Sequence, residues 1–167
     1  MSTSDAVGPD RLEATRVIAA TPEAIFSVLT DPQGHVDIDS SGMLQSATGE
    51  RVTAAGDSFV VHMDREALGD IPEMGEYDVT VTIADLDPDR SISWTILGRI
   101  RPQIGHTYGY RLEPAEPAAD GSPRTLVTSV YDWSQAAPEW RSIFPVISAQ
   151  HLKATLGILA REVRRRG

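Results

Sequence analysis

The sequence contains no cysteine among its 167 residues. Disulfides, thiolate metal sites and a cysteine nucleophile are therefore excluded. No stretch approaches the ~20 consecutive apolar residues of a membrane-spanning helix, so we expect no stable insertion into a membrane. The first ten residues carry neither a basic segment nor an apolar run, which predicts that there is no secretory signal and that the protein is cytoplasmic.

Positive charge is scarce. The chain has 15 Lys and Arg against 24 Asp and Glu, which gives a net charge of −9. Such an acidic surface repels phosphate backbones, so we expect no nucleic-acid partner. Four arginines gather within residues 161–166, where cations stabilise a helix C-terminus and Arg166 can pair with Glu162. This cluster is thus interpreted as a helix end and not as a binding patch.

The length suits one domain with a substantial core. Residues 1–10 have the composition of a flexible N-terminal leader, and we assign residues 11–167 to a single domain.

The C-terminus predicts one long amphipathic helix over residues 146–166. Its apolar stripe is formed by Leu152, Leu156, Leu159 and Val163. Pro145 cannot sit inside that helix, so residues 140–144 should form a separate turn. Gly157 lies in the middle of the helix, where it allows either close contact with a sheet or space for a ligand.

The rest of the chain predicts a strand, a pair of short helices and then six strands. The first strand covers residues 12–19, and Thr21-Pro22-Glu23 is typical of a helix start. From residue 43 to 133, alternating apolar and polar residues between turns favour an antiparallel meander. The terminal helix is the only long element that can cover its apolar face, and a curved sheet under one helix favours a cavity. The expected fold class is α+β.

Four stretches resemble the START-like (SRPBCC) superfamily, in its polyketide cyclase/dehydrase and lipid transport branch. They are residues 20–26, Asp31-Pro32 with His35 and residues 39–42, residues 85–94, and residues 131–134. The resemblance covers about residues 11–166. It implies a helix-grip fold of the START/Bet v 1 type, a curved antiparallel sheet wrapped around a long C-terminal helix. Because this fold hosts carriers, receptors, enzymes and Hsp90 activators, the resemblance does not decide the function.

An inner set of aromatic and polar side chains forms the candidate ligand site. The set comprises Trp94, His106, Tyr108, Tyr110, Tyr131, Trp133, His151 and Thr155. Aromatic walls with a few hydroxyl or imidazole groups suit a flat, mostly apolar ligand. We therefore expect a carrier or sensor of a hydrophobic, aromatic, lipid-like or polyketide-like molecule, acting as a monomer or homodimer without a cofactor.

Two other functions stay open. A cyclase, aromatase or dehydratase would use a pocket histidine or tyrosine for proton transfer, and an Hsp90-activator-like module would bind a protein. No residue is assigned a catalytic role.

Several polar side chains allow a second interpretation. His35, Asp37 and Asp39 alternate as metal ligands can, but loop bracing is favoured and no metal is expected. Asp132 could be a buried base, although it more simply braces the turn after it. His62 is expected on the solvent face of its strand.

Overall fold

The computed structural model describes residues 9–66, 74–98 and 101–167. The elements run in the order β1 (Arg11–Ile18), α1 (Pro22–Leu29), α2 (Pro32–Asp37), β2 (Leu44–Thr48), β3 (Ser58–Asp64), β4 (Glu76–Asp87), β5 (Ser91–Leu97), β6 (Thr107–Ala115), β7 (Arg124–Asp132), the 3-10 helix η2 (Pro138–Ile143) and α3 (Ala149–Arg166). Most of the proposed leader, residues 1–8, lies outside the described residues.

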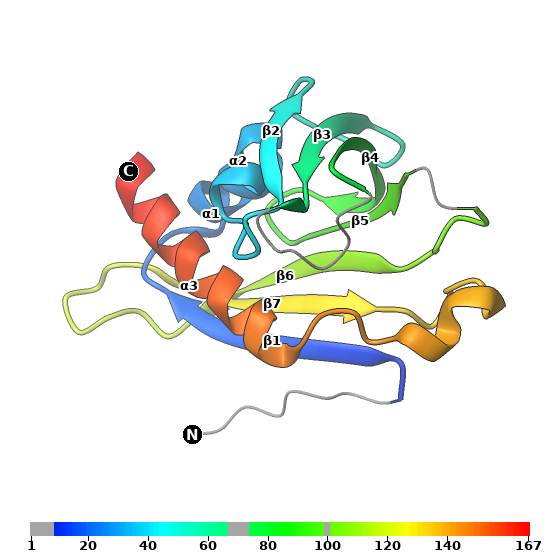
Figure 1. The fold of residues 1–167 in the computed structure, drawn as a ribbon. Helices are drawn as coiled ribbons and strands as arrows, with labels where there is room; N and C mark the ends of the chain where they lie inside the picture. Colours follow the sequence, from blue (N-terminus) through cyan, green and yellow to red (C-terminus); the bar gives the residue numbers. More distant parts are fainter. Residues whose placement is uncertain (1–8, 67–73, 99–100) are drawn as a thin grey trace.

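The seven strands form one antiparallel sheet in the order β1-β7-β6-β5-β4-β3-β2. The sheet curves so that β2–β4 rise beside α2, and α3 crosses in front of β7 and β1 (Figure 1). The first strand thus pairs with the last strand, while β2 lies at the opposite edge. The predicted fold class, a curved antiparallel sheet with a long C-terminal helix, is confirmed.

Both short helices begin at a proline that follows a capping side chain. Thr21 Oγ1 accepts from Ala24 N at 3.2 Å, and Asp31 Oδ1 accepts from Gln33 N at 3.1 Å. Each cap satisfies a backbone donor that the first helical turn leaves unpaired. The two caps place α2 directly after α1 and fix where the following loop leaves toward β2.

Helix α3 begins slightly later than predicted, because Ser148 is its cap and accepts from His151 N at 3.2 Å. Its stripe is buried, as predicted, and residues 138–143 form the separate turn η2. At its end, Arg166 contacts Glu162, Asp31 and Asp37 at 3.0–3.1 Å. The pairs with Asp31, the cap of α2, and with Asp37 attach the helix end to α2.

Gly157 of α3 faces β1. A Cβ atom at this position would lie 3.6 Å from Arg16 Nη1, an ordinary van der Waals distance. The glycine does not line the pocket described below. Gly157 thus neither opens space for a ligand in the pocket nor touches the backbone of the sheet, since its neighbour is the end of an arginine side chain.

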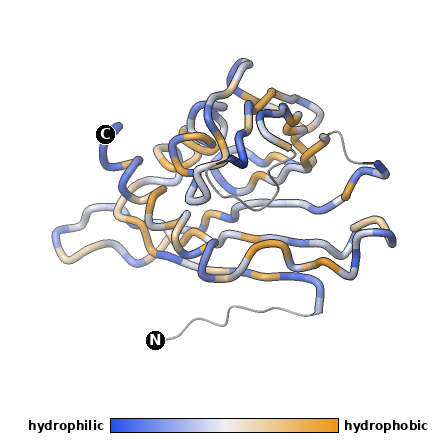
Figure 2. Tube along the Cα trace, in the orientation of Figure 1, coloured by the Kyte–Doolittle hydropathy of each residue, from blue (hydrophilic) through white to orange (hydrophobic). Residues whose placement is uncertain are grey.

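The core fills the inner face of the sheet. Hydrophobic positions recur along the strands and α3, and the C-terminal end of α3 is hydrophilic (Figure 2). On β3, Phe59, Val61 and Met63 are buried. His62 between them is on the outer face, 2.8 Å from Thr48 Oγ1 and 2.7 Å from Asp78 Oδ1, which confirms its predicted solvent position. None of the described helices is long and apolar enough to cross a membrane.

Candidate ligand-binding pocket

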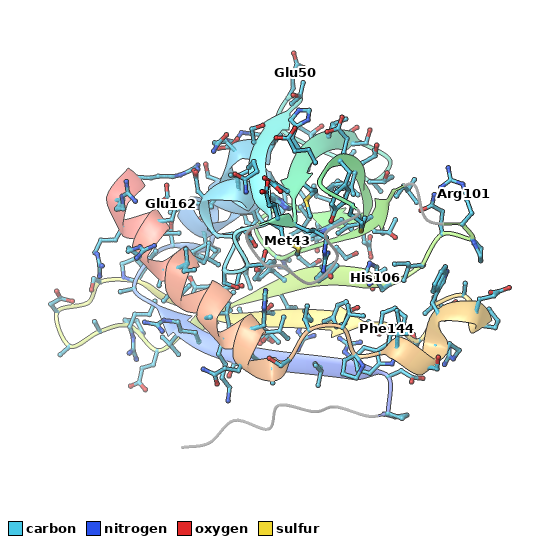
Figure 3. All side chains as sticks on the ribbon, in the orientation of Figure 1. Met43, Glu50, Arg101, His106, Phe144 and Glu162 are labelled. Atoms are coloured by element: carbon cyan, nitrogen blue, oxygen red, sulfur yellow. The ribbon has the colours of Figure 1, made fainter. Side chains whose placement is uncertain are left out.

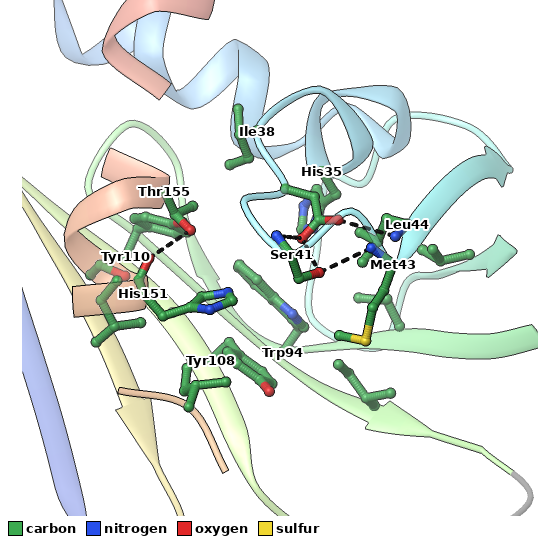
Figure 4. A pocket seen from close by; sticks show the side chains of 18 of the residues that line it. His35, Ile38, Ser41, Met43, Leu44, Trp94, Tyr108, Tyr110, His151 and Thr155 are labelled. Atoms are coloured by element: carbon green, nitrogen blue, oxygen red, sulfur yellow. Dashed lines mark hydrogen bonds between the residues drawn. The ribbon is translucent and has the colours of Figure 1, made fainter. Parts of the chain in front are cut away.

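A cavity of about 160 Å³ lies between the inner face of the sheet, the loop from α2 to β2 and the first turns of α3. Figure 3 shows the side chains that fill the molecule around it, and Figure 4 shows the pocket itself. The lining residues are His35, Ile38, Asp39, Ser41, Met43, Leu44, Val61, Met63, Val79, Val81, Trp94, Ile96, Tyr108, Gly109, Tyr110, Ser129, Val130, Ile147, His151, Leu152 and Thr155.

The sheet side of the pocket is an aromatic wall. Trp94 of β5 stacks at 6.2 Å between ring centroids with Tyr108 and at 5.9 Å with Tyr110, both on β6. Strand alternation places these rings on one face, because Trp94 pairs with Tyr108 and Ile92 with Tyr110. Such a wall offers flat apolar contact area to a ligand ring.

The two tyrosine hydroxyls of this wall lie near other hydroxyl groups of the protein, that of Tyr108 near Tyr131 and that of Tyr110 near Ser129. Burial raises the pKa of each of the two wall tyrosines to about 12, so both stay neutral at neutral pH.

The helix side of the pocket presents His151 and Thr155. The His151 ring projects from α3 into the pocket, between Thr155 and Tyr108 (Figure 4). Within the part of the chain that the structure describes, this imidazole has no hydrogen bond or ion pair. Thr155 Oγ1 donates to the His151 carbonyl at 3.1 Å and lies 2.9 Å from Ser40 Oγ. The Ser40–Thr155 contact joins α3 to the loop that follows α2.

The loop side of the pocket is braced by Asp39. Its Oδ1 accepts from Ser41 N at 3.0 Å and from Ser41 Oγ at 2.7 Å, and its Oδ2 accepts from Leu44 N at 3.1 Å. Ser41 Oγ in turn accepts from Met43 N at 3.1 Å. Figure 4 shows these bonds holding the loop over the pocket. The predicted bracing role of Asp39 is confirmed.

His35 of α2 closes the pocket opposite the strands. Its ring is 7% exposed, and Nε2 lies 2.8 Å from the Leu29 carbonyl oxygen. The ring meets Trp94 edge-on at 4.6 Å and Phe59 at 5.0 Å. Burial lowers the pKa of His35 from 6.5 to about 4, against the hydrogen bond to Leu29, which raises it. The imidazole is neutral at neutral pH.

The pocket reaches the surface between the loop and α3. Lining residues on this side, such as Met43, Leu44, Ile147 and His151, are half-buried, whereas the floor residues Val81 and Trp94 are buried. A ligand would therefore enter past the side chains of residues 43–44 and 147–151.

Three of the eight predicted site residues lie elsewhere. His106, Tyr131 and Trp133 pack with Phe144 at ring distances of 5.5–6.4 Å, and none of these four lines the pocket. We call these four residues the closed cluster. Strand alternation correctly gave them the inner face. However, Phe144, from the connection between η2 and α3, fills the space that the prediction left open to a ligand.

The closed cluster contains a buried polar pair. His106 Nδ1 lies 2.7 Å from the Tyr131 hydroxyl, and the Tyr131 ring lies 4.7 Å from that of Tyr108. Burial lowers the pKa of His106 from 6.5 to about 4 and raises that of Tyr131 well above its usual range. Of His106, Tyr131 and Tyr108, only Tyr108 lines the pocket.

The other candidates have structural partners. Asp37 pairs with Arg166 at 3.0 Å, so it is directed away from His35. Among the described residues there is no group of three His, Cys, Asp or Glu side chains that could hold a metal ion. Asp132 Oδ1 accepts from Ser134 N and Oγ at 2.8 and 2.6 Å, which confirms that it braces the turn.

The sequence interpretation missed His35, Asp39 and Ser41 as pocket-lining residues. The resemblance had drawn attention to this loop, but no periodicity shows that a loop folds back over a sheet. The position of this loop over the sheet depends on α1 and α2, the two successive capped helices that precede it.

A model of the family described as polyketide cyclase/dehydrase and lipid transport matches residues 9–164. The chain belongs to this family. The match includes all of the described pocket and the closed cluster. This family assignment confirms the resemblance noted from the sequence.

An uncharacterised protein from Mycobacterium tuberculosis is 24% identical over 132 residues, which are 77% of this chain and 50% of that protein. The chain thus spans about half the length of this relative.

Solved structures of the same fold include the Zhui aromatase/cyclase from Streptomyces sp. R1128, with a TM-score of 0.62 and 19% identity over 93% of this chain and 94% of that one. The Aha1 dimer from Colwellia psychrerythraea has a TM-score of 0.58 and 16% identity, covering 92% and 95% of the two chains. At these identities the likeness concerns the fold alone.

Proposed function

We propose that this protein binds a small, mostly apolar aromatic molecule in the pocket, as a carrier or sensor. The observation that supports this best is the composition of the pocket wall. Trp94, Tyr108 and Tyr110 supply flat apolar area, and His151 supplies an imidazole without a partner among the described residues. A concave apolar site with a few polar groups is the usual form of a small-molecule site.

The size of the cavity limits the ligand. An apolar cavity of roughly 150 Å³ holds a benzene-sized molecule, and the present one is about 160 Å³. Typical sites for drug-sized ligands are larger, at about 300–1,000 Å³. The proposed ligand therefore has one ring or two fused rings, or is a longer molecule that inserts only one end.

The polar geometry favours binding over catalysis. A general base is normally oriented by a third group, and among the described residues His151 has no such partner. Asp39, the carboxylate in the lining, is engaged by Ser41 and Leu44. The alternative, a cyclase, aromatase or dehydratase, draws support from the fold shared with the Streptomyces aromatase/cyclase.

The first experiment is native mass spectrometry of the purified protein, followed by calorimetric titration with one-ring and two-ring aromatics. Met43→Trp places a larger ring at the half-buried entrance and should abolish binding. The matched control is Leu97→Trp, because Leu97 is exposed and lies outside the lining. Equal affinity in both variants would contradict the pocket assignment.

A second experiment separates carrier from enzyme. The protein is incubated with β-keto and polyketide-like compounds, and products are followed by mass spectrometry. Multiple turnovers that His151→Ala abolishes would replace the carrier proposal by the enzymatic one.

A further inference from the structure

The direction of one buried hydrogen bond fixes the protonation of His35. A carbonyl oxygen can only accept, so the 2.8 Å contact with Leu29 requires that Nε2 carries the ring proton. Because the imidazole is neutral, Nδ1 has a free lone pair. No described residue donates to Nδ1, and the two ring nitrogens point in widely divergent directions. Because Nε2 points at the Leu29 carbonyl, Nδ1 on the other side of the ring points away from it, and the His35 ring lines the pocket.

The polar side chains of the loop beside His35 also have no free proton to donate into the pocket. Both carboxylate oxygens of Asp39 accept from backbone N–H groups, so the group acts as an acceptor. Ser41 Oγ is 2.7 Å from Asp39 Oδ1 and must donate its single proton there. What Ser41 can still offer to the pocket is lone-pair density.

The hydroxyl of Thr155 is likewise committed. It donates to the His151 carbonyl, which can only accept, and it therefore accepts from Ser40 Oγ at 2.9 Å. His35, Asp39, Ser41 and Thr155 line the pocket from α2, from the loop after it and from α3, and we call these four residues the acceptor wall. His151 at the entrance can serve in either role, since its ring has no partner in the described chain to fix it.

We infer that the acceptor wall selects ligands that bring their own hydrogen-bond donors, namely hydroxylated aromatics of the phenol type. This inference rests on the proposed function and specifies its ligand class. A phenol O–H satisfies the lone pair of His35 Nδ1, whereas an ether or hydrocarbon of the same shape leaves a buried acceptor unpaired. Sites of this kind discriminate strongly between a hydroxylated ligand and its analogue without the donor.

The test compares phenol with its methyl ether anisole and with toluene, by calorimetry or protein-observed NMR. Anisole buries more apolar area than phenol, so a purely hydrophobic pocket prefers anisole. We expect phenol to bind about tenfold tighter than anisole, as for one buried hydrogen bond. Equal binding of all three, or tighter binding of anisole, would overturn the acceptor wall and leave the proposed function intact. Binding of none would overturn the proposed function, and the inference with it.

A direct readout uses nitrogen-15 NMR of the histidine side chains in the unmodified protein. His35 should show the Nε2–H tautomer, with an unprotonated Nδ1 whose resonance shifts when phenol is added and stays when anisole is added. A protonated Nδ1, or no response to saturating phenol, contradicts the inference. This measurement does not depend on the folding of any variant.

The matching substitution is His35→Phe, which keeps an aromatic ring and removes the acceptor. The preference for phenol over anisole should be lost in this variant. His62→Phe is the control, because His62 lies on the outer face, away from the pocket. A preference that survives in His35→Phe would assign the selectivity to another group.

Discussion

Two regions on the inner face of the sheet contain the same types of residue, but one lines a cavity and the other is tightly packed. In the pocket, Trp94, Tyr108 and Tyr110 face a cavity. In the closed cluster, His106, Tyr131, Trp133 and Phe144 pack ring against ring. Both regions contain a neutral buried histidine. The difference lies in what covers the strands.

Phe144 arrives at the closed cluster from the connection before α3, with its ring stacked at 6.2 Å on Trp133. Over the pocket, the cover is a loop held by Asp39 together with one imidazole, His151. Inward-facing aromatic residues on strands thus do not by themselves define a binding site. The covering segment decides whether the rings contact each other or a ligand.

The largest effect should come from helix α3, which packs on the sheet with a buried stripe. Leu156 of α3 is 1% exposed, and Leu156→Ala should lower the free energy of unfolding by ~2–5 kcal/mol through lost burial and a cavity. Urea unfolding measures this change. The control Val146→Ala, at a 47% exposed position, should cost less than about 0.5 kcal/mol. A change that small in Leu156→Ala would mean that the stripe is not core.

Acid should destabilise both regions, because each contains a histidine whose pKa of about 4 lies below its unfolded value of 6.5. Between these pH values the unfolded chain binds more protons, so stability falls as the pH falls from 6.5 to 4. At 1.36 kcal/mol per pKa unit, each of the two histidines should lower the free energy of unfolding by on the order of 3 kcal/mol between pH 7 and pH 4. Unfolding midpoints from pH 7 to 4 should depend less steeply on pH in His35→Phe and in His106→Phe. An unchanged slope in either variant would show that folding does not lower the pKa of its histidine.

Phe144→Ala should convert the closed cluster into a second cavity. We expect a loss of about 2 kcal/mol, less than for a fully buried phenylalanine because this ring is half-buried. A dry apolar cavity binds benzene, so added benzene should recover part of the stability. The control Ile143→Ala, at a neighbouring position that is 51% exposed, should neither lower the stability nor make it respond to benzene. No response to benzene would mean that the cluster collapses once Phe144 is removed.

The sequence predicted the strands and α3 well, because the periods of two and 3.6 residues report local geometry. The stripe Leu152, Leu156, Leu159 and Val163 and the solvent position of His62 follow from such counting. The pocket was predicted only in part. Whether Tyr131 contacts a ligand or Phe144 depends on the path of the segment between η2 and α3, whose sequence has no periodic pattern. The same holds for His35, whose role depends on a hydrogen bond to Leu29 that no sequence spacing indicates.

The smallest expected effects distinguish the two regions most sharply. The sequence placed both His106 and His151 in the candidate ligand site, but the structure gives the two rings different surroundings. His151 faces the pocket and has no partner in the described chain, so His151→Ala should weaken phenol binding by ~1–2 kcal/mol, as for one hydrogen bond. Its unfolding free energy should change by less than about 0.5 kcal/mol.

His106→Ala should do the reverse, because it leaves the buried Tyr131 hydroxyl without its 2.7 Å partner. An unsatisfied buried polar group costs about 1–3 kcal/mol of stability, whereas phenol affinity should stay within about threefold because His106 does not line the pocket. Calorimetric titration measures the phenol affinity of both variants, and urea unfolding measures their free energies of unfolding. If His106→Ala weakens binding as much as His151→Ala, the ring contacts of Tyr108 with His106 at 5.2 Å and with Tyr131 at 4.7 Å transmit the change into the pocket. The closed cluster would then be part of the ligand site, since Tyr108 lines the pocket and contacts Tyr131 of the closed cluster.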